Sequence, residues 1–458
     1  MNKFAGRSST ALARKRAFGG AAVVLAAALA LTACSSSGTG GSSASPSGPV
    51  NITVWAQQGQ PGEVKAAQAE TASFNASQTG IKATLKLLPQ ATYDQTIATT
   101  AISQLPDVIE INGETLGSMV YAKKVVPLTG LVSAANISNQ LSSLIAEGTY
   151  PGDNKYYAIA QYDSGLALYG NKKLLDAAGI KYPTTWQAAW TFPQFKAAVV
   201  ALAAKNKSGY GLDIKENYAG TWPGYAFTPI VNGTSNPAQA GTGFELVHND
   251  KATGSLNAPA VAANLAAFAT LRKYSDPSAD DSAFTNGRAG LAWVGHWAYP
   301  TLSKALGANL VVIPLPNFGN GSKSGQGSHS WVITSNSKSA QAAAKYLDWV
   351  TADAQIKAVT DANGAVPGSK TAVAASPLYK QGGPLYLYAQ QLAASCGTAV
   401  PTPSCVTVPR TISPAWPVIN TAFSQAFWNI WKGGNAQSEL NKAAQTIDQA
   451  YSDNNNYK

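Results

Sequence analysis

The chain has 458 residues, of which 45% are hydrophobic and only 12% are charged, and its formal net charge is +10. Five basic residues and no acidic residue precede position 34, so the chain from that position on carries a net charge of +5. That remainder contains no stretch rich in Lys and Arg, which removes most of the support for nucleic-acid binding. Its length predicts two domains or lobes.

The N-terminus has the order of a secretory signal peptide. A basic opening is followed by an apolar run over residues 21–31, which is shorter than the roughly 20 residues that a membrane-spanning helix needs. The run leads into the sequence LTAC at residues 31–34, which resembles the lipobox of bacterial lipoproteins. We therefore predict a signal peptide over residues 1–33 and a lipid on Cys34. A cleaved signal with an incidental cysteine is the alternative.

The segment that follows is a predicted tether. Residues 35–49 are almost entirely Ser, Gly, Thr, Ala and Pro, which cannot bury a core and behave as a flexible linker. We assign residues 34–49 to this tether. It would hold the folded part at the outer face of the cytoplasmic membrane, in an extracellular or periplasmic position.

Strands and helices alternate through the folded part, which begins at about Val50. This alternation predicts an α/β fold with a mainly parallel sheet and helices on both of its faces. The predicted strands or extended segments cover residues 51–55, 81–88, 106–111, 158–169, 310–314 and 331–334. The predicted helices cover residues 63–75, 93–103, 172–178, 192–206, 258–274, 340–351 and 436–451.

Two cysteines remain beside the one at position 34. Cys396 and Cys405 are separated by eight residues, among Gly, Ser, Thr and Pro. In an exported protein such a pair predicts a disulfide, which would stabilise the fold by about 2–3 kcal/mol. The three histidines lie far from these cysteines in the sequence. We expect no metal site and no cofactor.

Ten short segments follow one another along the chain after the tether. They are ITVW at 52–55, PDVI at 106–109, LALYGNK at 166–172, AGI at 178–180, PTTW at 183–186, FTNGRAGL at 284–291, GHW at 295–297, PLP at 314–316, GAVP at 364–367 and PAW at 414–416. In this order they resemble the sugar-binding proteins of ABC importers, the maltose-binding-protein-like family of extracellular solute-binding proteins. The resemblance covers nearly the whole chain after the tether. One departure is Gly170, where the family often has a second tyrosine.

The resemblance implies a periplasmic-binding-protein-like fold of two α/β lobes, joined by a hinge of crossing strands, with the ligand in the cleft between them. The first lobe would comprise residues 50–162 and 329–365. The second lobe would comprise residues 163–328 and 366–458. Such hinges close over a ligand.

The resemblance also implies a monomeric receptor, not an enzyme. It would capture a carbohydrate, a di- or oligosaccharide, and deliver it to a permease pair driven by a cytosolic ATPase. A glycoside hydrolase and a surface lipoprotein that binds the cell wall are the alternatives. Within the transport interpretation, glycerol-phosphate-type and other polar ligands stay open.

Sugars present C–H faces that stack on aromatic rings and hydroxyls that need paired donors and acceptors. Trp and Tyr are plentiful, at 11 and 19, although a large core would also use them. Trp297 follows a predicted strand and matches a sugar-stacking residue of the family, as Trp416 does. Trp222 and Tyr225 lie in a loop with Gly and Pro. Core packing is the alternative for all four rings.

Polar candidates complete the predicted site. Glu114 follows the third strand at its carboxyl end, where α/β sheets bind ligands, although an acid at a helix N-terminus is also stabilised by the dipole. By resemblance it matches an acid that binds hydroxyls, and Asp163 matches another at the first crossing. The remaining candidates are Gln57, Gln58, Asn217, Tyr218, Ser328 and Arg410.

Overall fold

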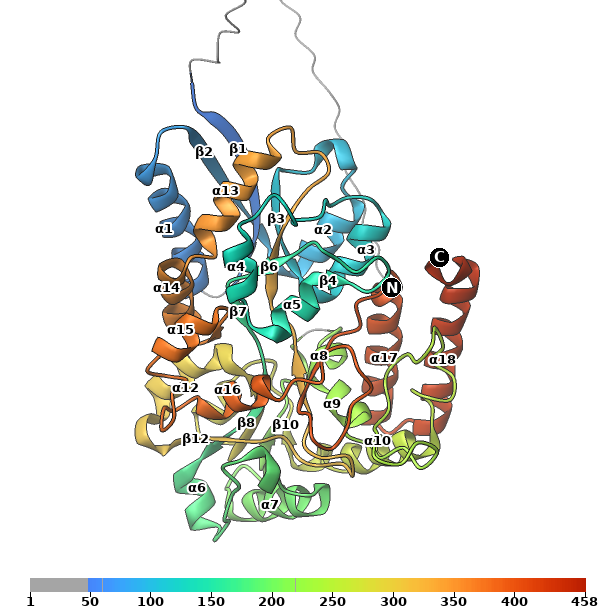
Figure 1. Cartoon of the computed structure of the whole chain (residues 1–458). Helices are drawn as coiled ribbons and strands as arrows, with labels where there is room; N and C mark the ends of the chain where they lie inside the picture. Colours follow the sequence, from blue (N-terminus) through green and yellow to red (C-terminus); the bar gives the residue numbers. More distant parts are fainter. Residues whose placement is uncertain (1–47, 60, 219) are drawn as a thin grey trace, which may run out of the picture. The chain divides into compact units, whose positions relative to one another are not determined.

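The computed structural model describes residues 48–59, 61–218 and 220–458. Residues Gly48–Lys458 form one compact unit. The predicted signal peptide, Cys34 and nearly all of the predicted tether lie outside the described residues. Two five-stranded sheets, each with helices packed around it, make up most of the unit (Figure 1).

The first sheet has the strand order β2-β1-β3-β14-β6. Its first three strands are parallel, with Val54 of β1 opposite both Leu85 of β2 and Val108 of β3. Strand β14 runs antiparallel to β3 and to β6. The strands are β1 Val50–Gln58, β2 Ile81–Pro89, β3 Val108–Asn112, β6 Ile159–Ala160 and β14 His329–Ile333.

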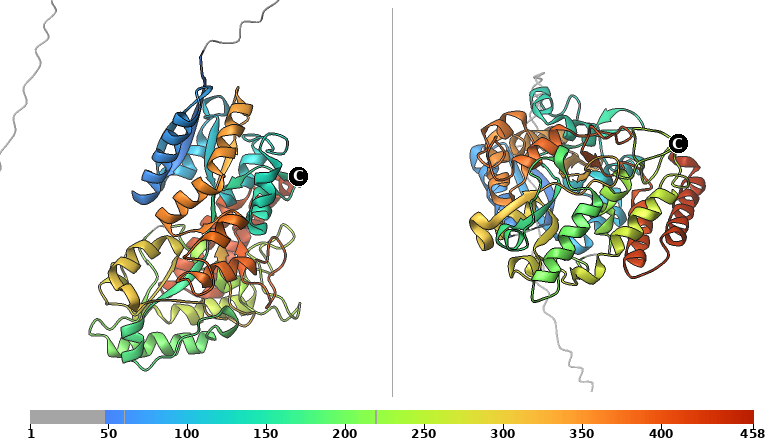
Figure 2. Two further views of the ribbon diagram at one scale, coloured as in Figure 1. Left: turned by 60° about the vertical axis from the view of Figure 1, so that its left-hand side comes forward. Right: turned by 90° about the horizontal axis from the view of Figure 1, so that it is seen from below.

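Helices cover both faces of this sheet (Figures 1 and 2). Phe74 of α1 and Leu347 of α13 pack with Val54 on one face. Ile97 of α2 and Leu116 of α3 pack with residues of β3 on the other. The helices are α1 Pro61–Ser77, α2 Tyr93–Thr99, α3 Leu116–Tyr121, α4 Ala134–Asn139, α5 Ser142–Gly148, α13 Ala340–Val350 and α14 Asp353–Asn363.

The second sheet has the order β10-β9-β11-β8-β12. Strand β8 is antiparallel to both of its neighbours, whereas β9 is parallel to β10 and to β11. The strands are β8 Leu166–Asn171, β9 Leu212–Asp213, β10 Ser275–Asp276, β11 Leu291–Gly295 and β12 Leu310–Ile313. Both sheets are therefore mixed, and the prediction of a mainly parallel sheet is wrong. The prediction fails because β14 and β8 belong to chain segments that pass between the sheets. Each of these strands enters its sheet in the direction opposite to that of its neighbours.

The largest core lies against the second sheet, where Phe227 and Phe427 stack with ring centroids 4.2 Å apart. Helices α17 and α18 pack against each other over this core (Figure 1). The helices around this sheet are α6 Lys172–Ala177, α7 Phe192–Lys205, α8 Pro223–Ala226, α9 Thr228–Asn232, α10 Pro259–Ala269, α11 Ser282–Thr285, α12 Tyr299–Leu306, α15 Lys370–Ala375, α16 Tyr386–Ala393, α17 Trp416–Trp431 and α18 Ala436–Asp453.

Short two-stranded pairs lie where the chain passes between the sheets. After β6 in the first sheet, β7 Tyr162–Asp163 pairs antiparallel with β15 Val366–Pro367, and the chain then enters the second sheet as β8. Strand β13 Ser324–Gln326 pairs with β16 Thr407–Pro409 immediately before the chain returns to the first sheet as β14. The remaining pair is β4 Thr149–Tyr150 with β5 Lys155–Tyr156. The exact lobe limits stay a prediction.

The predicted disulfide is present, because Cys396 and Cys405 are bonded. Within the residues that the structure describes, no helix is both long and apolar enough to cross a membrane. No group of three or more His, Cys, Asp or Glu residues in the described ranges has a geometry that could hold a metal ion.

Two predicted helices are shorter than expected. The segment 258–274 is helical only over α10, and Arg272–Tyr274 form a separate 3-10 turn. The segment 93–103 is helical only to Thr99, and Ile102–Gln104 form a separate 3-10 turn. The ammonium group of Lys124 donates hydrogen bonds to the carbonyls of Ile97, Ala98 and Thr100 at 2.7–3.0 Å. These carbonyls lie at the helix C-terminus, where a lysine satisfies groups that have no helical partner.

Candidate functional site

Three aromatic side chains form a group that we call the aromatic cluster: Trp222, at the N-terminus of α8, Tyr225, within α8, and Trp297. The Trp297 ring centroid lies 6.0 Å from that of Tyr225 and 6.2 Å from that of Trp222. Trp297 follows β11 in a short 3-10 turn, as the sequence predicts, and is partly exposed. The indole nitrogen of Trp222 donates to the carbonyl of Ile214 at 3.1 Å, which fixes the cluster to the core.

Arg410 joins the aromatic cluster to the first sheet. Its guanidinium lies 4.7 Å from the Tyr225 ring centroid, within the range of a cation–π contact. Its Nη1 also donates to Oε1 of Glu114 at 2.6 Å, although the two residues are 296 positions apart in the chain. A β-carbon on Gly327 would approach the guanidinium within 2.5 Å, so the crossing strand needs a glycine there.

Two further carboxylates lie beside this ion pair. Glu147, at the end of α5, accepts a hydrogen bond from the backbone nitrogen of Ser328 at 3.2 Å. Asp163, in β7, accepts one from the Ser143 hydroxyl at 2.5 Å. The glutamate and the aspartate are 3% and 0% exposed. Arg410 is ion-paired with Glu114 alone, but its charge also acts on Glu147 and Asp163.

Burial dominates the protonation of these acids. Desolvation raises the pKa of Glu114 to about 7, against the opposing pull of Arg410. Desolvation and then the charge of Asp163 raise the pKa of Glu147. Desolvation also raises the pKa of Asp163, although its hydrogen bonds from Ser143 and Ser164 oppose this. One arginine does not offset the burial of three acids.

Several polar atoms of this site have no hydrogen-bond partner among the described residues. They are Oε2 of Glu114, Oε2 of Glu147, the hydroxyl of Tyr225 and Nε of Arg410. Buried polar groups in folded proteins are nearly always paired, and each unpaired one is destabilising. The arrangement therefore offers acceptors and donors to a polar molecule beside aromatic rings.

A histidine lies on each side of Tyr162. His296 hydrogen-bonds the Ser164 hydroxyl through Nε2 at 2.6 Å, and burial lowers the pKa of this histidine to about 3, so its ring is neutral. Burial also opposes protonation of His329, but Glu110, with Oε1 3.4 Å from Nδ1, outweighs it and raises the pKa.

Four predicted residues lie at the margins of this site. The backbone nitrogen of Gln57 donates to Glu110, which faces His329, while Gln58 is exposed at the end of β1. Asn217 is exposed and donates to the carbonyl of Pro277 at 2.7 Å. Tyr218 is 45% exposed, and its ring lies 5.6 Å from that of Trp222, at the outer edge of the aromatic cluster.

Trp416 begins α17, is 3% exposed and packs within the large core of the second sheet, to which Trp222 also belongs. Helix α17 contacts α8, which carries Tyr225, and the 3-10 turn that carries Glu114. A role of Trp416 in ligand binding stays a prediction, with core packing as its alternative. The structure brings together Trp297, Trp222, Tyr225, Glu114, Asp163, Ser328 and Arg410.

Sequence reasoning missed Glu147, His296 and Glu110. Glu147 stands in an otherwise apolar and small stretch, Leu144 to Gly148, and this contrast is the signal that could have found it. His296 directly precedes Trp297, and Glu110 alternates with buried residues of β3.

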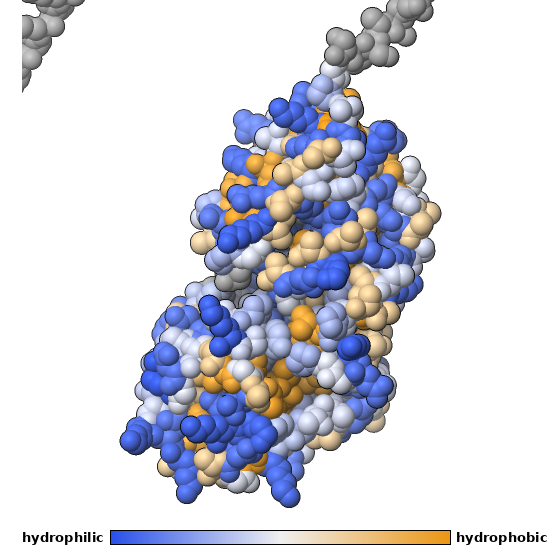
Figure 3. Space-filling view, turned by 90° about the vertical axis from the view of Figure 1, so that its left-hand side faces the viewer, coloured by the Kyte–Doolittle hydropathy of each residue, from blue (hydrophilic) through white to orange (hydrophobic). Residues whose placement is uncertain are grey.

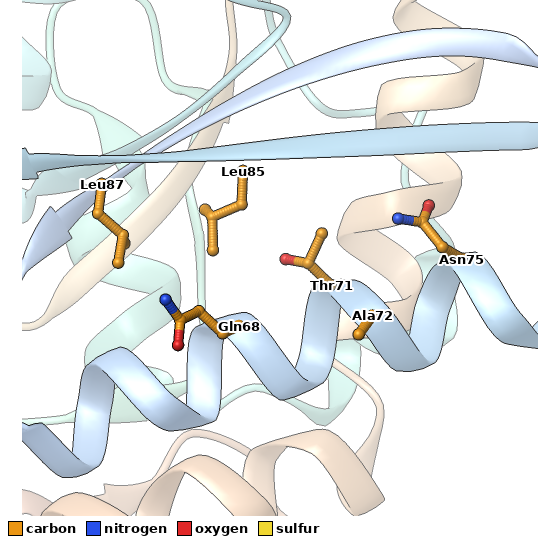
Figure 4. Close-up of a pocket in the computed structure, with 6 residues that line it drawn as sticks. All are labelled: Gln68, Thr71, Ala72, Asn75, Leu85 and Leu87. Atoms are coloured by element: carbon orange, nitrogen blue, oxygen red, sulfur yellow. The ribbon is translucent and has the colours of Figure 1, made fainter.

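A separate groove lies between α1 and β2, with a volume of about 440 Å³. Figure 4 shows Leu85 and Leu87 of β2 facing the helix. Its lining residues, Gln68, Thr71, Ala72, Asn75, Leu85 and Leu87, include no ring and no charge. Figure 3 shows the side of the molecule that lies at the left of Figure 1, and hydrophilic side chains predominate on it. This groove lacks the chemistry of the site around Arg410.

Several solved structures with the same fold are described as proteins that bind saccharides or related compounds. The cyclic alpha-maltosyl-1,6-maltose binding protein of Arthrobacter globiformis superposes with a TM-score of 0.70 and 20% identity, over 89% of this chain and 100% of that one. Maltose-bound MalE3 of T. maritima superposes with a TM-score of 0.71 and 15% identity, over 88% of this chain and 100% of that one. The GacH receptor of Streptomyces glaucescens superposes with a TM-score of 0.65 and 18% identity, over 88% of this chain and 98% of that one. These likenesses establish the two-lobed fold.

No curated protein sequence matches the chain significantly. A family described as bacterial extracellular solute-binding protein does match it, over residues 70–383. Members of this family bind a solute rather than transform it, which agrees with the prediction that the chain is not an enzyme. The chain belongs to the family of bacterial extracellular solute-binding proteins.

Proposed function

We propose that the chain is a lipid-anchored receptor that captures a carbohydrate, a di- or oligosaccharide, and delivers it to an ABC importer. One observation carries the proposal: the aromatic cluster adjoins buried polar atoms that have no partner within the described chain. A sugar supplies C–H faces for the rings and hydroxyls for those atoms. The structural neighbours named above are described as binding proteins for maltose and related saccharides.

The residues have distinct roles in this proposal. Trp297 is the stacking platform, because it is the partly exposed indole of the cluster. Glu114 and Glu147 accept hydrogen bonds from hydroxyls through their unpartnered Oε2 atoms, and Arg410 donates through Nε. Because Arg410 and Glu114 come from opposite sides of the crossing strands, a ligand bound to both would hold the lobes together.

Calorimetry with a panel of mono-, di- and oligosaccharides tests this function. We expect micromolar affinity for at least one sugar, about −8 kcal/mol. Trp297→Ala should weaken that binding by more than about tenfold, which corresponds to ~1.4 kcal/mol. Trp186→Ala is the matched control, since Trp186 is also a partly buried indole in a short 3-10 turn but is outside the cluster. Binding of peptides or amino acids, with no heat from any sugar, would refute the carbohydrate function.

The lipid anchor and the importer are proposed from the sequence and the family. Cys34 would carry the lipid, and residues 34–49 would let the receptor reach its permease. Labelling with a radioactive fatty acid should mark the wild type and not Cys34→Ser, which should appear in the medium or the periplasm. Equal membrane retention of both forms would refute the anchor. Loss of sugar uptake in cells that lack the receptor would support delivery.

A further inference from the structure

The candidate site holds three carboxyl groups and one guanidinium, although the chain as a whole is basic. Glu114, Glu147 and Asp163 surround Arg410 closely enough that its charge lowers the pKa of each of them. If all three acids were ionised, the group would carry two net negative charges. The chain from position 34 on has a net charge of +5. The excess of carboxyl groups is thus a local property of this site.

Two of the acids each have a carboxyl oxygen with no hydrogen-bond partner among the described residues. Oε1 of Glu114 binds Arg410 and Oε1 of Glu147 accepts from Ser328, which leaves Oε2 of each buried and unpartnered. The Glu147 carboxylate lies against Gly113, where a β-carbon would come within 1.5 Å of Oε1. Because Gly113 and Glu114 are neighbours in the chain, the two carboxylates flank one short turn at the end of β3.

We propose that the solute of this receptor carries a positive charge, as an amino-substituted sugar whose ammonium group binds between Glu114 and Glu147. This inference rests on the proposed function. An ammonium donates to both unpartnered oxygens and stabilises the ionised form of the two carboxyls, in exchange for the protons that burial favours. A hydroxyl donates a single hydrogen bond and leaves those protons in place.

The rings beside the acids fit the same ligand. A cation over Trp or Tyr gains a cation–π contact, and Arg410 already makes one with Tyr225. The partly exposed face of Trp297 stays available to the sugar ring. Recognition would thus combine stacking of the pyranose with ion pairing of its amine.

Calorimetry at pH 6.5, where a sugar amine is mostly protonated, tests the inference with ligands that differ at one position. The probes are glucosamine, N-acetylglucosamine and glucose, and the β-1,4-linked disaccharides of the same three units. A set of neutral α-linked glucose oligosaccharides is measured beside them. We expect the amine form to bind at least tenfold more tightly than the matched acetylated and hydroxylated forms.

A charge variant separates ion pairing from general attraction. Glu147→Gln keeps the Oε1 acceptor for Ser328 and removes a carboxyl that can release its proton to pair with an ammonium, so the preference for the amine should fall at least tenfold. Asp176→Asn is the matched control, because it removes one negative charge from a side chain that is 55% exposed. This variant should keep the wild-type preference.

The outcomes distinguish the inference from the proposed function. If neutral sugars bind and the amines bind equally or more weakly, the inference is overturned and the carbohydrate function stands. If no carbohydrate of either kind binds, both are overturned. An amine preference that survives in Glu147→Gln would also overturn the assigned ammonium position.

Discussion

Replacing Glu147 with glutamine should make the ligand-free protein more stable at pH 8 and leave it nearly unchanged at pH 5. Desolvation and the neighbouring Asp163 raise the pKa of this carboxyl in the folded state. Between its ordinary pKa and the raised one, the unfolded chain releases the proton while the folded chain keeps it. The free energy of unfolding therefore falls as the pH rises through this window. Glutamine is neutral throughout and does not contribute to the fall.

The magnitude follows from the size of the shifts. One pKa unit corresponds to about 1.4 kcal/mol. For Glu114, whose pKa rises from 4.5 to about 7, the stability lost between those values is about 3 kcal/mol. We expect the free energy of unfolding of Glu147→Gln to exceed that of the wild type by at least ~1.4 kcal/mol at pH 8, which corresponds to one pKa unit. The side chain keeps the acceptor for Ser328, so little is lost in exchange.

Urea unfolding at pH 5, 6, 7 and 8 measures the effect, with the slope against urea compared to confirm that both proteins unfold in the same way. Asp176→Asn, on the exposed surface, should follow the wild type at every pH. Equal stability of wild type and Glu147→Gln at pH 8, or a steeper loss in the variant, would refute the reasoning that burial keeps this carboxyl protonated.

Two other changes probe local structure. Reduction of the Cys396–Cys405 disulfide should lower the free energy of unfolding by about 2–3 kcal/mol, measured by denaturation with and without reductant, and an unchanged midpoint would contradict this. Gly327→Ala should displace the guanidinium of Arg410, since the new β-carbon would lie 2.5 Å from it, and weaken sugar binding by about tenfold. Wild-type affinity in that variant would show that the Arg410 position is not needed.

Local patterns predicted the first sheet well. The β-branched run at residues 51–55 lies within β1, and the predicted helix 63–75 lies within α1. Helix α17 was missed because its polar stripe is narrow: only Thr421, Gln425 and Asn429 recur at four-residue spacing on its less buried side, among mostly apolar residues. The direction of β14 could not be predicted either, since it depends on how the chain returns to this sheet from the other one.

The candidate site was likewise predicted only in part. Trp297 and Glu114 follow strands, and strand ends are where such folds place ligands, so position and the family resemblance together selected them. That Glu114 would meet Arg410 could not be predicted, because 296 positions separate them and only the folded chain joins them. Trp416 was selected by resemblance, and its burial in the core is a tertiary property that a Pro-rich segment does not reveal.

The pH dependence of stability and the charge of the ligand are coupled. Because Glu114 and Glu147 hold protons in the ligand-free protein at pH 5, an ammonium must displace those protons to bind the carboxylates. Its affinity should therefore rise up to about tenfold per pH unit between pH 5 and 7 for each proton released. A neutral sugar binds without releasing protons, so its affinity should stay flat. Calorimetry of glucosamine and glucose units at these pH values separates the two, and a flat profile for the amine would show that its nitrogen does not replace a proton in this site.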